Sequence, residues 1–130
     1  MSKLVAVWGP TGAPGRTTVA INLAAELAEQ GQSVLLIDAD SYGGAVAPVL
    51  GLVDEAAGFA AACRLAESGS LSVEELTRLS HQVSTGAANM RVLSGIVRSD
   101  RWPELSAERV KKVLSLAEEN FEIVVVDVGF

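Results

Sequence analysis

Residues 9–18 read GPTGAPGRTT and lie between a short apolar run, residues 4–8, and a stretch with helical periodicity. In that stretch Val19, Leu23 and Leu27 recur at helical spacing. The apolar run is short and ends at a Gly-Pro pair, so we expect a strand that is buried on both faces. The segment therefore predicts a glycine-rich loop that joins a strand to the N-terminus of a helix.

A loop at such a junction favours a phosphate ligand. Backbone N–H groups converge there, and the helix dipole adds partial positive charge. The ordinary phosphate-loop pattern, G-x-x-x-x-G-K-[ST], is met only at Gly15 and Thr17, because Pro10 stands at its first glycine and Arg16 at its lysine. The alternative is a turn rich in glycine and proline that binds nothing, and the surrounding pattern favours phosphate.

The rest of the chain alternates strands with helices. Residues 33–37, 90–93 and 123–126 predict three further strands, the last of them a β-branched run. The predicted helices lie over residues 45–52, over residues 55–66, from a capping box of Ser72 and Glu75 to near His81, and from a cap at Ser106. This order is typical of the α/β class, with a parallel sheet and right-handed crossover helices in one domain over residues 1–130.

Acidic residues follow two of the predicted strands. Asp38 and Asp40 come after the second strand, and Asp127 ends the last one. Ligands of open α/β sheets bind at the carboxyl edge of the strands, which is also the edge that the loop occupies. These carboxylates are candidate site residues, and the alternative is that they only end a strand and begin a turn.

Composition narrows the class of protein. Of the 130 residues, 49% are hydrophobic and 20% charged, which fits an ordered domain. A net charge of -6 argues against strong sequence-independent binding of nucleic acid. Cys63 is the only cysteine, so neither an internal disulfide nor an all-cysteine metal site is expected, and a reducing, cytoplasmic location fits. The longest apolar runs are shorter than the ~20 residues that span a bilayer.

The loop, the helix after it and the strand-end acids resemble the ParA/MinD superfamily of deviant P-loop ATPases, and most of all its CpaE/TadZ-type branch of pilus-assembly and septum-positioning proteins. The family's loop reads Lys-Gly-Gly-x-Gly-Lys-Thr, and residues 11–17 occupy the same seven places, with matches at Gly12, Gly15 and Thr17. The resemblance implies a Rossmann-like, three-layer P-loop NTPase domain. Residues 1–130 would form its N-terminal part, truncated after the fourth predicted strand.

The resemblance also implies a site for ATP or ADP with Mg²⁺. The implied nucleotide-binding residues are Gly12, Ala13, Gly15, Arg16, Thr17 and Thr18. Thr17, Asp38 and Asp127 are expected to serve the metal ion, Thr17 through its hydroxyl. Asp40 and Arg16 are the expected catalytic residues, because Asp40 would orient the attacking water and Arg16 replaces the lysine that touches the outer phosphates.

Two further residues of the loop bear on its function. Thr11 stands where the family has a lysine that reaches a partner's nucleotide across a dimer, and Pro14 has no N–H group to offer a phosphate. We therefore keep two hypotheses. The first is an ATP-binding, slowly hydrolysing switch that dimerises and positions a cellular machine, and the second is a pseudo-ATPase scaffold that has lost hydrolysis. A third hypothesis, a P-loop ligase or kinase, has no visible substrate site.

Possible partners follow from the same reasoning. The resemblance implies that a later strand, absent from residues 1–130, would cover one edge of the strand at residues 4–8. The apolar edge left exposed predicts self-association or a homodimer. The resemblance points to a protein partner in a positioning, pilus or septum machinery, and the segment gives no support for DNA or membrane contact.

Overall fold

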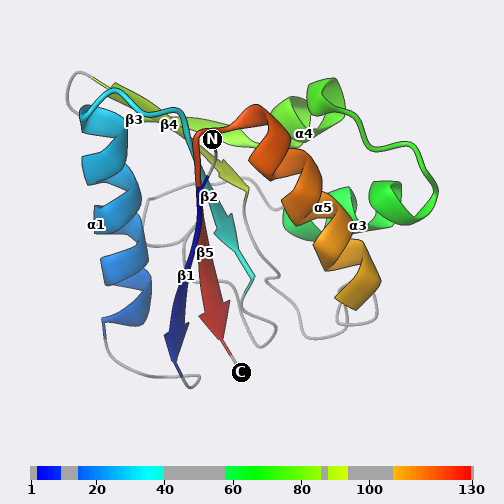
Figure 1. Ribbon diagram of the computed structural model, residues 1–130, viewed down its shortest axis with the longest axis horizontal. Helices are drawn as coiled ribbons and strands as arrows, with labels where there is room; N and C mark the ends of the chain where they lie inside the picture. Colours follow the sequence, from blue (N-terminus) through cyan, green and yellow to red (C-terminus); the bar gives the residue numbers. More distant parts are fainter. Residues whose placement is uncertain (1–2, 10–14, 40–57, 86–87, 94–106, 130) are drawn as a thin grey trace.

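The computed structural model describes residues 3–9, 15–39, 58–85, 88–93 and 107–129 (Figure 1). Within them lies one five-stranded sheet with the order β1-β5-β2-β4-β3. The strands are β1 (Lys3–Gly9), β2 (Val34–Asp38), β3 (His81–Thr85), β4 (Ala88–Leu93) and β5 (Ile123–Gly129). The pairs β1–β5, β5–β2 and β2–β4 are parallel, as the alternation of strands and helices predicts.

Helices cover both faces of the sheet and make three layers. Helix α1 (Arg16–Glu29) lies on one face, and α3 (Gly58–Glu67), α4 (Val73–Leu79) and α5 (Ala107–Asn120) gather on the other (Figure 1). The predicted helix over residues 55–66 thus begins at Gly58. The predicted helix over residues 45–52 and the predicted cap at Ser106 lie outside the described residues.

Side-chain alternation along the central strands builds two cores. In β2, Leu35 and Ile37 join the cluster beneath α3 and α5, whereas Val34 and Leu36 join the cluster beneath α1. All five residues of β2 are buried. A strand packed on both faces needs apolar side chains on both, which explains the continuous apolar runs of β2 before Asp38 and of β5 before Asp127.

Strand β1 differs from its prediction. Residues 4–8 were expected to be buried on both faces, but Leu4 is 44% and Trp8 67% exposed. The reason is that β1 is an edge strand in the described sheet, paired only with β5. Its residues Leu4, Ala6 and Trp8 face the side on which α3 and α5 cover only the more central strands. The expectation of burial on both faces is therefore wrong for this strand.

Strand β3 was not predicted. The helix expected to end near His81 ends at Leu79, and His81–Thr85 then pairs antiparallel with β4. The start of that helix agrees with the capping box, since the Glu75 N–H donates to Ser72 Oγ at 3.3 Å. Cys63 is buried in α3, as a small core residue would be. In the described part of the chain no helix is long and apolar enough to cross a membrane.

Candidate functional site

The carboxyl ends of the parallel strands and the N-terminus of α1 lie at the same edge of the sheet (Figure 1). This arrangement follows from connectivity, because a parallel strand that is followed by a crossover helix ends where the helix begins. The edge holds the first residue of α1, Arg16, and the strand-end carboxylates Asp38 and Asp127. It is the edge at which ligands of α/β sheets bind.

Gly15 forms the N-cap of α1 in a left-handed conformation, with φ 85° and ψ -10°. Its carbonyl accepts the Val19 N–H at 2.8 Å, the first hydrogen bond of the helix. A glycine adopts this backbone without strain, and it has no side chain with which to cap the first N–H groups of the helix. A Cβ placed on Gly15 would meet no heavy atom of the described residues within 4 Å. An anion at this position is favoured by the helix dipole.

Asp38 and Asp127 are both fully buried at this edge. They are register partners on the neighbouring strands β2 and β5. The Ala39 N–H donates to the Asp127 carbonyl oxygen at 2.9 Å and so extends the pairing to the edge. Two buried carboxyl groups on adjacent strands are an arrangement that favours a nearby cation.

Arg16 supplies one such cation. Its Nε lies 2.8 Å from Asp127 Oδ1, and the two side chains are 7% and 0% exposed. The pair connects the start of α1 to the end of β5. The sequence marked both residues as site candidates, but it gave no signal that they pair with each other, since they stand 111 positions apart.

The donor set fits Mg²⁺. This ion prefers oxygen ligands and usually keeps several waters, so that one or two carboxylates suffice. Within the described residues no group of three or more His, Cys, Asp or Glu side chains is placed to hold a metal ion. Asp38 and Asp127 would hold the ion, and Arg16 and the N-terminus of α1 would face an anion beside it.

The remaining predicted site residues are described less fully. Thr18 lies in the first turn of α1 with an exposed side chain. Thr17 is placed in the same turn by its backbone, but its side chain lies outside the described atoms. Gly12, Ala13 and Asp40 lie outside the described residues.

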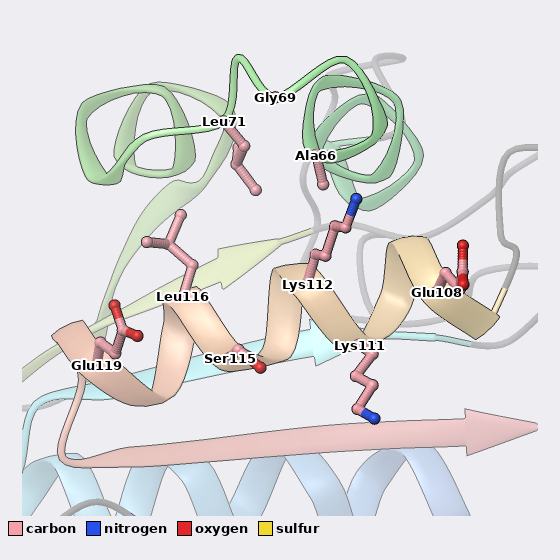
Figure 2. A pocket seen from close by; sticks show the side chains of 9 residues that line it. All are labelled: Ala66, Gly69, Leu71, Glu108, Lys111, Lys112, Ser115, Leu116 and Glu119. Carbon is pink, nitrogen blue, oxygen red and sulfur yellow. The ribbon is translucent and has the colours of Figure 1, made fainter.

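A separate groove of about 650 Å³ lies between α5 and the connection from α3 to α4 (Figure 2). Leu71 and Leu116 point toward each other across it, and the charges around it are mixed, with Lys112 on one side of α5 and Glu119 near its end. None of the site residues predicted from the sequence lines this groove. It is therefore distinct from the sheet edge that carries the strand-end acids.

The chain is similar to several known proteins. The model of a family described as an AAA domain matches residues 2–129. The sporulation initiation inhibitor protein Soj of Bacillus subtilis is 27% identical over 133 residues, which cover 98% of this chain and 49% of Soj. The chain spans half or less of the length of the curated relatives that it matches.

Solved structures show the same fold. A ParA family ATPase from Chlorobium tepidum superposes with a TM-score of 0.81 at 16% identity, over 98% of this chain and 51% of the ATPase. The septum site-determining protein MinD from Pyrococcus horikoshii, solved in complex with Mg-ADP, superposes with a TM-score of 0.71 at 22% identity, over 98% of this chain and 49% of that protein.

Proposed function

Because this chain belongs to the AAA-domain family that matches residues 2–129, and with it to the ParA/MinD superfamily of P-loop ATPases, we propose that it binds ATP or ADP with Mg²⁺ at the carboxyl edge of its sheet. One observation carries the proposal. The N-terminus of α1, the buried Arg16 and the two buried carboxylates Asp38 and Asp127 converge at that edge. Positive charge for an anion and oxygen ligands for a cation are thereby brought together, which is the combination that a metal-bound nucleotide requires.

The proposed roles divide between phosphate and metal ion. Gly15 and the first turn of α1 offer N–H groups to the phosphates, together with the loop residues Gly12 and Ala13. Thr17 and Thr18 complete that turn, and Thr17 contributes its hydroxyl to the metal ion. Asp38 and Asp127 hold the ion and its waters. Mg²⁺, when bound, neutralises phosphate charge at the site.

Turnover is proposed to be slow. Arg16, in place of a lysine, carries its charge on a broad planar group, and Pro14 removes one N–H donor from the loop. Asp40 is the residue that we propose to orient the attacking water. The switch hypothesis depends on this residue and on dimerisation. The pseudo-ATPase alternative is favoured by Thr11, Ala13, Pro14 and Arg16.

We propose further that copies of this chain associate through β1, which has an unpaired edge among the described strands and exposes Leu4 and Trp8. A role in positioning a cellular machine, within the CpaE/TadZ-type branch, and a cytoplasmic location also remain proposals. The positioning role is supported by the name of one relative, the septum site-determining protein MinD.

Calorimetric titration with ATP in the presence of Mg²⁺ tests the binding proposal. We expect saturable binding by the wild-type chain and a loss of about tenfold or more in affinity for Arg16→Ala, because a buried charge that faces the phosphates is removed. Lys111→Ala is the control: it removes an exposed positive charge of α5 that lines the separate groove, and it should leave the affinity unchanged.

Two outcomes decide between the hypotheses. No heat of binding for the wild-type chain, or equal losses for Arg16→Ala and Lys111→Ala, would refute a nucleotide site at this edge. If ATP binds, measurement of phosphate release separates the slow switch from the pseudo-ATPase. Release that Asp40→Asn abolishes supports the switch, and binding without release supports the scaffold.

A further inference from the structure

Arg16 and Asp127 form a buried ion pair in the centre of the candidate site. Arg16 Nε donates to Asp127 Oδ1 at 2.8 Å, and neither side chain is more than 7% exposed. Charges removed from water to this extent are costly unless they are paired with good geometry. Each partner therefore holds the other in place.

Both partners are also needed for other contacts when a ligand binds. The guanidinium of Arg16 is the buried cation beside the proposed phosphate position, and Asp127 is a proposed metal-binding carboxylate. A cation next to Asp127 would repel the guanidinium, since like charges in a poorly hydrated site interact strongly. Asp38, fully buried and in register with Asp127, adds negative charge that attracts either cation.

We propose that Arg16 and Mg²⁺ alternate as counter-ions of Asp127, so that the nucleotide and the metal ion bind interdependently. The inference rests on the proposed nucleotide site. A nucleotide that arrives without metal draws Arg16 toward its phosphates and leaves the buried Asp127 with one positive partner fewer, which opposes binding. With Mg²⁺ beside Asp127, Arg16 is released toward the phosphates, which favours binding. The coupling acts equally in both directions.

The substitution that separates this coupling from simple metal binding is Asp127→Asn. Asparagine keeps the shape of the side chain but has no charge with which to hold Arg16. A role for Asp127 in metal binding alone predicts no gain in affinity for a metal-free nucleotide. Release of Arg16 predicts a gain, and that gain must disappear when residue 16 has no charge.

The experiment measures ADP affinity by calorimetry, in Mg²⁺ and in EDTA, for the wild type, Asp127→Asn, Arg16→Met and the double variant. We expect the wild type to bind ADP at least about tenfold more tightly with Mg²⁺ than without. In EDTA, Asp127→Asn should bind ADP about tenfold more tightly than the wild type. In the Arg16→Met background the same substitution should change the affinity by less than about twofold.

Each contrary result has its own meaning. An equal gain from Asp127→Asn in both backgrounds reflects relief of charge repulsion alone and overturns the proposal. Wild-type binding that is indifferent to Mg²⁺ also overturns it and needs no variant, but leaves the proposed nucleotide function standing. Absence of binding under every condition refutes the proposed function, and this inference with it.

Thermal unfolding provides a readout that needs no nucleotide. Arg16→Met and Asp127→Asn should each lower the Tm by about 5 °C or more, and the double variant should lose less than the sum, because the second substitution removes a charge that has already lost its partner. Additive losses of Tm would show that the two side chains are not coupled, which would contradict a stabilising ion pair between Arg16 and Asp127.

Discussion

A side chain at Gly58 has no room in this fold. Gly58 begins α3, and a Cβ placed on it would lie 2.7 Å from the carbonyl oxygen of Leu79 and 3.2 Å from Leu93 Cδ1. The first of these atoms belongs to the backbone at the end of α4, so it cannot move aside as a flexible side chain would. Glycine at this position therefore sets how closely α3 and α4 approach.

We expect Gly58→Ala to lower the free energy of unfolding by about 1–3 kcal/mol through this overlap. Helix propensity alone predicts the opposite sign, a gain of up to about 1 kcal/mol. Urea denaturation measures the difference. Gly69→Asn is the control, because Gly69 has φ +75° and open space around it, and asparagine tolerates that backbone. A Gly58→Ala variant as stable as the wild type would show that the helices can separate at no cost.

The site residues could be predicted one by one from the sequence. Asp38 and Asp127 are acids at strand ends and Arg16 is a basic residue at a loop–helix junction, and residues at these places often contact ligands. Their pairing could not, because it depends on β5 lying between β1 and β2. A contact across 111 residues is fixed by the packing of the sheet and not by local propensity.

At the scale of elements, α4 is stabilised by polar contacts at both ends. Ser72 caps its first turn, and within the helix Arg78 Nη2 donates to Glu75 Oε2 at 2.5 Å. The hydrogen bond from Arg78 holds the pKa of Glu75 below its usual value and raises the pKa of Arg78. Leu76 is the buried residue of this helix, so the helix packs on the core through one side chain and is stabilised at its surface by these polar contacts.

This ion pair gives a pH dependence of definite sign. Because the pKa of Glu75 is lower in the folded than in the unfolded chain, its contribution to stability is present above the ordinary pKa of 4.5 and is lost as the pH falls through the folded pKa. Titration by NMR should find the Glu75 carboxyl below its usual pKa, and Arg78→Met should return it toward that value. A Glu75 pKa that is the same in both proteins would contradict the hydrogen bond. Both groups are exposed, so the effect on total stability is small.

The strands differ in how well their sequence predicts them. Strands β2 and β5 are buried on both faces, and their β-branched and aliphatic runs made them evident. Strand β3, with the sequence HQVST, is polar and lies at the sheet edge, so it carries no such run. Its conformation depends on antiparallel pairing with β4, which a sequence read segment by segment does not contain.

At the scale of the whole molecule, one side of the sheet is covered unevenly. Over β5, Val124 and Val126 lie in the core beneath α3 and α5. Their register partners in β1 are Leu4 and Ala6, which are exposed. Among the described elements, the apolar surface of the sheet thus continues past α3 and α5. Burial of β1 was wrongly expected because a sequence indicates an apolar strand but not its place in the sheet.

This uncovered strand predicts self-association of the chain. An edge strand offers unpaired N–H and C=O groups, and apolar side chains beside it add surface that is stabilised by burial against a second copy. We expect the wild type to form a reversible oligomer at high concentration, and Leu4→Lys to weaken its association about tenfold or more, because a charge would have to be buried at the contact. Sedimentation velocity over a range of concentrations measures both.

Val19→Lys is the control that separates association through the β1 edge from nonspecific hydrophobic association. Val19 is 55% exposed on α1, more than Leu4, and the substitution removes a comparable apolar surface without changing β1. If association depends on the strand, Val19→Lys leaves it intact while Leu4→Lys weakens it. Equal weakening by both variants would indicate nonspecific hydrophobic contact, and a wild-type chain that stays monomeric at the highest concentration would rule out β1 as an interface between copies. The order of the two variants therefore decides whether β1, the edge strand among the described residues, is a specific contact surface.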